Sequence, residues 1–356
     1  MTGKARTLVI LTPGFPANEA DTTCVPARAI LVKTLKKNNP SLNIIVIAFQ
    51  YPFFSGNYSY YGAGVISLNG RNRGKFYRLL VWWKAWSSLL KIKKENEVIG
   101  ILSFWLSECA LIAGYFSRLY HIKQFTWLLG QDAKKGNIYY KLTKPHASTL
   151  IALSDFIADQ FFNNYSVRPA HVVPVGIDTS MFDFVEKERD IDVMGAGSLI
   201  PLKRYHLFIE IIKEIKPSLP DIRCVICGKG PEKERLLRLI EKAGLQNNIS
   251  LRDEVPHREV LQLMQQSKIF LHTSEYEGYG TVLSEALYAG AQVVSFCKPM
   301  KETFEHEYLV SSKEKAVCKL MDILNDKNRE HRRVLAYSIN DVAEKILQLF
   351  HEQAEA

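Results

Sequence analysis

The sequence predicts an α/β protein built from two doubly wound parallel sheets. Short apolar runs typical of buried strands alternate with amphipathic helical segments along the chain, the pattern of parallel sheets covered by helices. At 356 residues the chain is long enough for two such domains. Its glycine-bearing and charged motifs follow strand-like runs, where such sheets bind ligands. We predict one domain over residues 1–178 and a second over 179–335, with a last helix over about 336–356 packing back on the first domain.

Composition indicates a globular protein with unevenly distributed charge. The net charge is +9: residues 1–180 contain 21 Lys and Arg against 9 Asp and Glu, whereas residues 181–356 contain 25 against 28. The basic first half predicts an anionic substrate or surface. No apolar run approaches the roughly 18 residues that span a bilayer, and the run at residues 7–11 is too short for a signal peptide. We therefore expect a cytoplasmic protein.

One cysteine pair has metal-like spacing. Cys224 and Cys227 stand three positions apart, but they lie inside an apolar strand-like run and no second pair accompanies them. We expect reduced, buried, structural cysteines and no metal site.

The first domain begins with a predicted strand, a loop and a helix. The strand covers residues 7–12, the loop 13–25 contains Gly14, and the helix covers 26–37. After a second strand, residues 51–74 are rich in Tyr, Gly, Ser and Asn, which predicts an extended surface loop.

A basic helix with three tryptophans is predicted over residues 73–94. One interpretation is a core helix, with a stripe of Leu79, Trp83, Trp86 and Leu90 facing the sheet. The other is a helix that lies among the headgroups of an anionic membrane, at its inner face, because Trp rings and Lys or Arg side chains favour that zone. We expect no nucleic acid as a partner, because no nucleic-acid-binding motif is present.

The remaining expected elements follow in alternation. In the first domain we predict strands over 98–103, 125–129, 149–153 and 171–174, and helices over 106–119 and from the N-cap Ser154 to 162. In the second domain we predict strands over 193–199, 222–228, 249–251, 269–271 and 292–296, and helices over 202–216, 232–243, 282–289, 312–325 and 328–353, with a further helix that starts at His257, which we expect to be exposed.

The most informative stretch is a strand, a loop and a helix start over residues 269–289. Gly278 and Gly280 allow a tight turn and close approach of a ligand, and Thr281 is a candidate N-cap. The first helical amides suit a phosphate. On either side, Glu277 could accept hydrogen bonds from sugar hydroxyls, and Glu285 could bind a vicinal diol.

This Glu-x7-Glu pattern, with Gly-Tyr-Gly inside it and Glu-Ala-Leu-x-x-Gly after it, resembles the donor-binding signature of family-4 glycosyltransferases. These are retaining, nucleotide-sugar-dependent enzymes of GT-B fold, in which two Rossmann-like domains face a cleft. The resemblance implies that Gly278, Tyr279, Gly280, Thr281 and Glu285 bind the donor. It also implies that the donor is a UDP- or GDP-linked sugar, with no further cofactor and no metal.

Further segments of the second domain carry the same resemblance. Lys203 matches the family's diphosphate-binding Lys, whereas Ser198 stands where the family has an Arg, so Arg204 is the candidate substitute. Cations at a helix start suit a pyrophosphate. Gly228 and Gly230 resemble the Gly-x-Gly-Pro turn that lines the nucleotide pocket, and Val255 lies near the segment that holds the base. The donor-binding candidates of these segments are therefore Ser198, Lys203, Arg204, Gly228, Gly230 and Val255.

In the first domain the resemblance is looser. The family's first loop approaches the donor through a Gly pair, of which this chain has Gly14. A histidine usually precedes the family's Gly-x-Asp motif, but here Leu129 precedes Gly130 and Asp132. Asp132 or Gln131 could supply its contacts, or His121 or His146 could reach the site from elsewhere.

The resemblance implies a retaining glycosyltransferase with its acceptor in the basic first domain. The expected acceptor is a cell-surface polysaccharide, a lipopolysaccharide or a lipid-linked glycan precursor. Glu277, Lys203 and Asp132 are the candidate catalytic residues, with Lys203 stabilising the charge of the departing diphosphate. Two alternatives stay open: another enzyme of the same fold, such as a sugar phosphorylase or a nucleotide-sugar epimerase, and a catalytically impaired membrane-associated partner protein, which Leu129 and Ser198 would explain.

Overall fold

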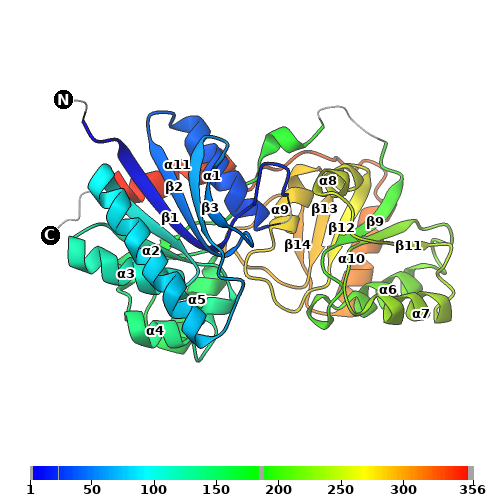
Figure 1. Ribbon diagram of the computed structural model, residues 1–356. Helices are drawn as coiled ribbons and strands as arrows, with labels where there is room; N and C mark the ends of the chain where they lie inside the picture. Colours follow the sequence, from blue (N-terminus) through cyan, green and yellow to red (C-terminus); the bar gives the residue numbers. More distant parts are fainter. Residues whose placement is uncertain (1–2, 23, 184–187, 352–356) are drawn as a thin grey trace. The chain divides into compact units, whose positions relative to one another are not determined.

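The computed structural model describes residues 3–22, 24–183 and 188–351, which form two compact α/β units (Figure 1). The first unit comprises Met1–Gly176 and Ile339–Ala356, and the second comprises Ile177–Ser338. The chain therefore passes from the first unit to the second and returns to the first with its last helix.

An eight-stranded sheet forms the centre of the first unit, in the order β3-β4-β2-β1-β5-β6-β7-β8. The strands are β1 (Arg6–Gly14), β2 (Asn43–Tyr51), β3 (Ser55–Tyr60), β4 (Ala63–Leu68), β5 (Glu97–Phe104), β6 (Gln124–Leu128), β7 (Leu150–Ala152) and β8 (His171–Val172). Every neighbouring pair is parallel except β3 and β4. β1 is buried from Thr7 to Thr12, as expected for a strand covered on both faces.

Helices cover both faces of this sheet. They are α1 (Pro26–Asn38), α2 (Lys75–Glu95), α3 (Glu108–Tyr120), α4 (Ile138–Thr143), α5 (Asp155–Tyr165) and α11 (Ile339–His351). α2 and α3 share a core with Ile101 of β5. Phe350 of α11 packs on Gly100, where an added Cβ would lie 2.1 Å from the Phe350 ring. Adjacent strand residues point to opposite faces, so α11 lies on the face opposite α2 and α3.

The loop expected over residues 51–74 is instead largely a β-hairpin, so that prediction is wrong. β3 and β4 pair in register from Ser55 with Leu68 to Tyr60 with Ala63. Tyr61 and Gly62 form the two-residue connection, both with positive φ (45° and 81°), which is the geometry that favours a tight hairpin. Because the segment contains many polar residues, its alternation of buried and exposed side chains was not recognised in the sequence. That alternation buries Val65 of β4 beside the parallel strand β2.

The core stripe predicted for the tryptophan helix is also wrong. The residues of α2 that face the sheet are Val81, Ala85, Leu89 and Ile92, all at most 4% exposed. In contrast, Leu79 is 58% exposed and Trp83 is 66% exposed. The helix therefore has two apolar stripes. In the predicted one Leu79 and Trp83 face solvent, whereas Trp86 is partly buried, with its ring centre 5.1 Å from that of Phe116.

The second unit has a six-stranded, fully parallel sheet in the order β11-β10-β9-β12-β13-β14. The strands are β9 (Ile191–Ala196), β10 (Cys224–Cys227), β11 (Ile249–Arg252), β12 (Ser267–His272), β13 (Gln292–Ser295) and β14 (Glu307–Leu309). β14 was not expected from the sequence. From β9 the chain adds β10 and β11 on one side of the sheet, and it then adds β12, β13 and β14 on the other side. The topological switch point therefore lies between β9 and β12.

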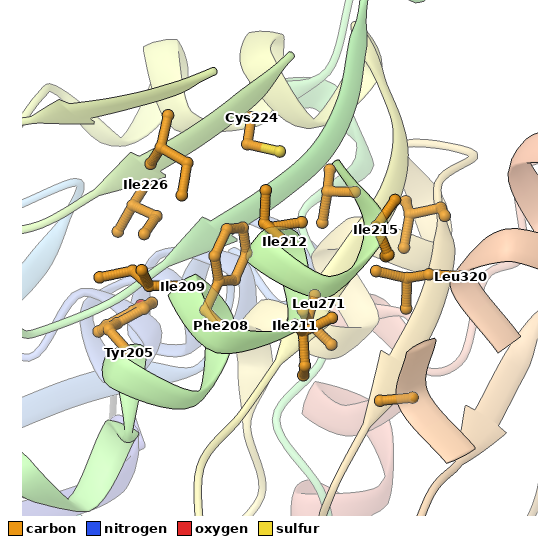
Figure 2. Packing of buried hydrophobic residues seen from close by; sticks show 14 of the residues in the cluster. Tyr205, Phe208, Ile209, Ile211, Ile212, Ile215, Cys224, Ile226, Leu271 and Leu320 are labelled. Atoms are coloured by element: carbon orange, nitrogen blue, oxygen red, sulfur yellow. The ribbon is translucent and has the colours of Figure 1, made fainter. Parts of the chain in front are cut away.

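Five helices within the described residues cover the faces of this sheet. They are α6 (Tyr205–Ile215), α7 (Lys233–Lys242), α8 (His257–Gln265), α9 (Thr281–Tyr288) and α10 (Lys313–Asn325). α6, α7 and α10 share one core with the sheet, and α8 and α9 share another. Figure 2 shows the first of these, with Phe208 and Ile212 of α6 near Ile226 of β10 and Leu271 of β12.

The last predicted helix begins later than expected, at Ile339 and not at Asn328. The preceding segment bonds to other parts of the chain: Ile177 N donates to Tyr337 O at 2.9 Å, and Val334 N donates to Leu287 O at 3.1 Å. These bonds replace the helical ones. The predicted end over residues 352–356 lies outside the described residues. In the described part of the chain, no helix combines the length and apolarity needed to cross a bilayer.

Candidate functional site

The candidate site lies at the carboxyl ends of β9 and β12, on either side of the switch point. Three hydrogen bonds join the loops that follow these strands: Thr273 Oγ1 donates to Lys203 O at 2.7 Å, Arg204 Nε donates to Thr273 O at 2.8 Å, and Glu275 N donates to Leu202 O at 3.1 Å. Two segments that are about seventy residues apart in sequence are therefore held together at this edge.

Lys203, Glu277 and His272 form a continuous polar chain. Lys203 Nζ donates to Glu277 Oε1, and His272 Nε2 lies 3.3 Å from the same oxygen. The side chains of Lys203 and Glu277 are 17% and 18% exposed, and His272 is buried. A carboxylate can only accept, so Nε2 of His272 carries the proton. The other oxygen, Glu277 Oε2, has no hydrogen-bond partner among the described residues.

Burial and neighbouring charges fix the protonation states of Glu277 and His272. Burial raises the pKa of Glu277, but the hydrogen bond from His272 and the charge of Lys203 outweigh burial and lower the pKa below its usual value. Burial lowers the pKa of His272, and Lys203 adds to that effect. The site therefore holds a carboxylate and a neutral imidazole near neutral pH.

Two residues behind His272 were missed by the sequence interpretation. Ser295 Oγ lies 3.5 Å and Cys297 Sγ lies 3.7 Å from His272 Nδ1. Burial raises the pKa of the Cys297 thiol to about 11, so it stays protonated and can donate weakly to Nδ1. His272 itself was not assigned a role, although its place as the last residue of β12 was a usable signal.

The start of α9 differs from the expected cap. Gly280, with φ 70°, is the N-cap and Thr281 is the first helical residue, so the prediction that Thr281 caps the helix is wrong. The left-handed backbone favours glycine, and an added Cβ would lie 3.1 Å from Leu283 Cδ1. No side chain caps this end, so the first amides are left without a side-chain partner. Tyr279 is buried and bonds Ser284 Oγ at 2.8 Å, which anchors the loop.

Glu285, one turn into α9, is anchored by a histidine. His257 Nε2 donates to Glu285 Oε1 at 2.8 Å, and this hydrogen bond raises the pKa of His257. The His257 side chain is 34% exposed, so the residue that we expected to be exposed at this helix start is only partly exposed. Glu285 Oε2 has no hydrogen-bond partner among the described residues. Val255, just before α8, packs against the core on this face of the sheet.

Gly228 and Gly230 allow the loops after β9 and β10 to touch backbone to backbone. An added Cβ would lie 1.9 Å from Gly197 O at Gly228 and 2.3 Å from Leu199 O at Gly230. Ser198 lies exposed in the β9 loop. The Arg204 guanidinium carbon lies 5.4 Å from the centre of the Phe296 ring, beyond the end of β13.

In the first unit, Asp132 and Gly14 line one cavity at the carboxyl edge of the sheet, with a volume of about 450 Å³. Both Asp132 oxygens accept backbone hydrogen bonds: Oδ2 from Leu106 at 2.9 Å, and Oδ1 from Leu129 at 3.0 Å and Gly130 at 2.8 Å. Burial raises the pKa of Asp132, and these bonds oppose the shift. The carboxylate therefore fixes the shape of its own loop.

Arg28, in the first turn of α1, is a second residue that the sequence interpretation missed in this region. Burial lowers its pKa to about 10, which leaves it cationic at neutral pH, and the charge of Asp132 opposes the shift. Its guanidinium carbon lies 5.6 Å from the centre of the Trp105 ring, and Trp105 lines the cavity. Arg28 Nε is buried and has no hydrogen-bond partner in the described chain.

His121 and His146 do not lie near these groups. His121 ends α3 and His146 precedes the turn into β7, so both stand at the amino ends of the strands. The alternative that either reaches the carboxyl edge is therefore wrong. Among the described residues, no group of three or more His, Cys, Asp or Glu side chains could hold a metal ion, and Cys224 and Cys227 are buried and unbonded to each other.

Two doubly wound sheets with a charged group of side chains at the switch point define an α/β protein of the class in which ligands bind at the carboxyl ends of the strands. Comparison with known proteins makes this specific, because residues 176–353, half of the chain, match the family described as glycosyl transferases group 1. The chain therefore belongs to the glycosyl transferases group 1 family, a family of glycosyltransferase enzymes.

Curated relatives and solved structures agree with this membership. The chain is 28% identical over 195 residues to one subunit of the phosphatidylinositol N-acetylglucosaminyltransferase of Arabidopsis thaliana, covering 50% of this chain and 43% of that protein. It is 29% identical over 103 residues to 2-deoxystreptamine N-acetyl-D-glucosaminyltransferase of Niallia circulans, covering 29% of this chain and 26% of that protein. The chain thus spans less than half the length of these relatives.

The fold also has a solved counterpart. Anabaena Alr3699/HepE, in complex with UDP and glucose, aligns with a TM-score of 0.71 at 14% identity, covering 97% of this chain and 99% of that one. At this identity the likeness concerns the fold alone, and it confirms the predicted GT-B class.

Proposed function

We propose that this chain is a retaining, family-4 glycosyltransferase that takes a sugar from a nucleotide sugar bound by the second unit. One observation carries the proposal. Lys203, anchored beside Glu277, stands at the switch point of the sheet, and both Glu277 and Glu285 are held through one oxygen while the other oxygen has no partner among the described residues. Such a set can grip an anion and hydroxyl groups at once.

The proposed roles follow from charge. As the bond to the sugar carbon breaks, negative charge grows on the departing diphosphate. Lys203, Arg204 and the uncapped amides at Gly280 and Thr281 supply the positive ends that stabilise it. The cations provide this charge without a metal ion. No residue of the second-unit site is placed as a nucleophile, so in our proposal the leaving phosphate itself accepts the proton of the acceptor hydroxyl.

The carboxylates orient the two ends of the donor. Glu277 Oε2 would accept from the sugar hydroxyls and Glu285 Oε2 from the ribose diol, with Gly228, Gly230 and Val255 beside the nucleoside. Donor binding would draw Lys203 partly away from Glu277, because a diphosphate competes for the ammonium. Glu277 would then keep its hydrogen bond with His272, which preserves its position.

We propose UDP as the nucleotide and an N-acetylhexosamine as the transferred sugar. Both curated relatives named above are N-acetylglucosaminyltransferases, and the solved neighbour was crystallised with UDP. A UDP-linked donor therefore has more support than the GDP-linked alternative.

The acceptor is proposed to bind the first unit at the cavity beside Asp132. Trp105 and Tyr139 supply flat walls there, and the cationic Arg28 stacks on Trp105. Asp132 would act as a positioning residue, because its oxygens are engaged by backbone amides. An acceptor with an anionic group next to a sugar or ring suits this combination, which agrees with a lipid-linked or polysaccharide precursor.

The exposed stripe of α2 supports a peripheral membrane location. Phe76 is 88% exposed and Trp83 is 66% exposed, and Leu79 and Leu80 lie between them on the same helical face. Cations, among them Lys84 and Lys91, flank the stripe. Aromatic and cationic side chains together favour the headgroup zone of anionic lipid.

A nucleotide-sugar screen followed by product analysis tests the function. We expect UDP-N-acetylglucosamine to raise the melting temperature more than GDP-mannose, because a ligand of the folded state stabilises it by mass action. UDP release that depends on an added acceptor, with the anomeric configuration kept, would support transfer. Turnover of the donor without an acceptor into an isomer or a sugar phosphate would favour an epimerase or a phosphorylase. Donor binding with no turnover under any acceptor would favour the impaired partner protein.

A further inference from the structure

The first unit contains another cavity, at the opposite edge of its sheet from Asp132. Its volume is about 520 Å³, and its lining comes from the amino ends of β6 and β8, the turn before β7, and one side of α3 with the end of α4. β6 is five residues long, so roughly 15 Å separates the two edges at about 3.3 Å per residue. The cavity is therefore distinct from both binding regions proposed above.

Positive charge is concentrated around this cavity. The lining includes five basic or imidazole side chains and, among the described lining residues, no Asp or Glu: Arg118, Lys123, Lys144, His146 and His171. Arg118 is oriented by donating to Thr143 O, and Lys123 Nζ donates to Leu349 O at 3.4 Å. Lys144 ends α4 with an exposed side chain that has no hydrogen-bond or ion-pair partner among the described residues. Among the described residues, Arg118 and Lys144 have no ion-pair partner, and such cations favour an anionic ligand.

The interior of the cavity adds a buried donor and an apolar surface. Ser117 is 7% exposed, and its Oγ is buried with no hydrogen-bond partner in the described chain. A buried hydroxyl without a partner is unfavourable, and a ligand oxygen would satisfy it. Ile122 and Phe125 provide apolar lining, and the ring of Phe125 meets His171 edge-on at 5.6 Å between ring centres.

We propose that this cavity binds a phosphomonoester with an apolar body. The phosphate would take Arg118 and Lys144 as cationic partners, with the His146 ring and the Ser117 hydroxyl as hydrogen-bond donors, while the body lies on Ile122 and Phe125. A phosphate suits this set better than a carboxylate, because three acceptor oxygens with nearly two charges can use several donors at once. The same chemistry is present in a free phosphorylated metabolite and in the headgroup of a phosphatidic acid. This site goes beyond the transfer reaction proposed above.

Calorimetric titration of the full chain with phenyl phosphate tests the site. We expect saturable binding that Lys144→Glu weakens by about tenfold, because a cation at a partly exposed site becomes an anion. Lys141→Glu is the matched control, since Lys141 is exposed on the same helix one turn earlier and does not line the cavity. Lys203→Ala should bind phenyl phosphate as the wild type does, which separates this site from the donor site. Lys144→Gln, with its fold checked by circular dichroism, provides a second, milder variant.

Vesicles distinguish the two sources of the phosphate. Flotation with phosphatidylcholine vesicles, with and without phosphatidic acid, is compared for wild type, Lys144→Glu and Lys141→Glu. A specific loss for Lys144→Glu in the soluble titration supports a metabolite, and a specific loss only in the vesicle assay supports a lipid headgroup. Equal behaviour of both variants in both assays, or loss of phenyl phosphate binding in Lys203→Ala, overturns the proposal.

Discussion

Replacing Lys203 with alanine should lower turnover far more than it lowers stability. The side chain is 17% exposed and contacts Glu277, so its charge acts in a setting that water screens only partly. If the ammonium faces the departing diphosphate, its loss removes one preorganised donor from the charge that develops in the transition state. A single donor of this kind is worth about 100- to 1000-fold in kcat, or roughly 3–4 kcal/mol. Lys203→Arg keeps the charge in a different shape and should recover part of the rate.

The assay measures the release of UDP as the sugar of UDP-N-acetylglucosamine is transferred to water or to an acceptor found by screening. Donor affinity is measured by calorimetry. Lys213→Ala is the matched control, because Lys213 is exposed on α6 and has no side-chain hydrogen bond or ion pair among the described residues. Thermal melts show whether each variant is folded. A folded Lys203→Ala enzyme whose kcat stays within a factor of about three of the wild-type value would refute the proposed role.

Three further predictions concern other parts of the molecule. The hydrogen bond to Glu285 raises the pKa of His257, so the pair stabilises the fold fully below the unfolded histidine pKa of about 6.5 and less as the pH rises through the pKa of the folded state. In thermal melts, His257→Gln should therefore lose more stability at acidic than at alkaline pH, and an equal loss at both would contradict the pairing. Gly230→Ala places a Cβ 2.3 Å from a backbone oxygen of the β9 loop and should lower the free energy of unfolding in urea by about 1–3 kcal/mol. Gly114→Ala adds a Cβ in open space on α3, so it should be neutral or slightly stabilising, and equal effects of the two variants would count against the backbone contact. Trp83→Ser should weaken flotation with anionic vesicles but leave donor affinity unchanged, and unaltered flotation would remove α2 as the membrane contact.

The fold class could be predicted because most of the parallel strands are apolar runs that are followed by a helix. The orientation of α2 could not, because its sequence offers two apolar stripes. Trp83 and Leu79 belong to the larger one, yet the smaller Val81 and Ala85 face the sheet and share a core with α3. Periodicity identifies an amphipathic helix, but it does not select between two apolar stripes of the same helix.

The candidate site also contains residues that the sequence could predict and residues that it could not. The loop after β12 indicated its chemistry through Glu277, Glu285 and the glycines around Tyr279. His272 holds Glu277 and could have been noticed only from its place at the end of β12, whereas His257, which holds Glu285, has no sequence signature of its own. His257 reaches Glu285 across 28 positions, through the packing of α8 against α9. Such contacts depend on tertiary structure and leave no local pattern.

Hydrogen–deuterium exchange of the full chain, with and without saturating UDP, reports on the proposed donor site without requiring a known acceptor. If the diphosphate binds at the switch point of the second sheet, protection should appear in peptides covering 198–204 and 276–285, where the β9 loop and the start of α9 supply its contacts. Protection confined to the first unit, or no protection at saturation, would contradict the assignment of the donor site.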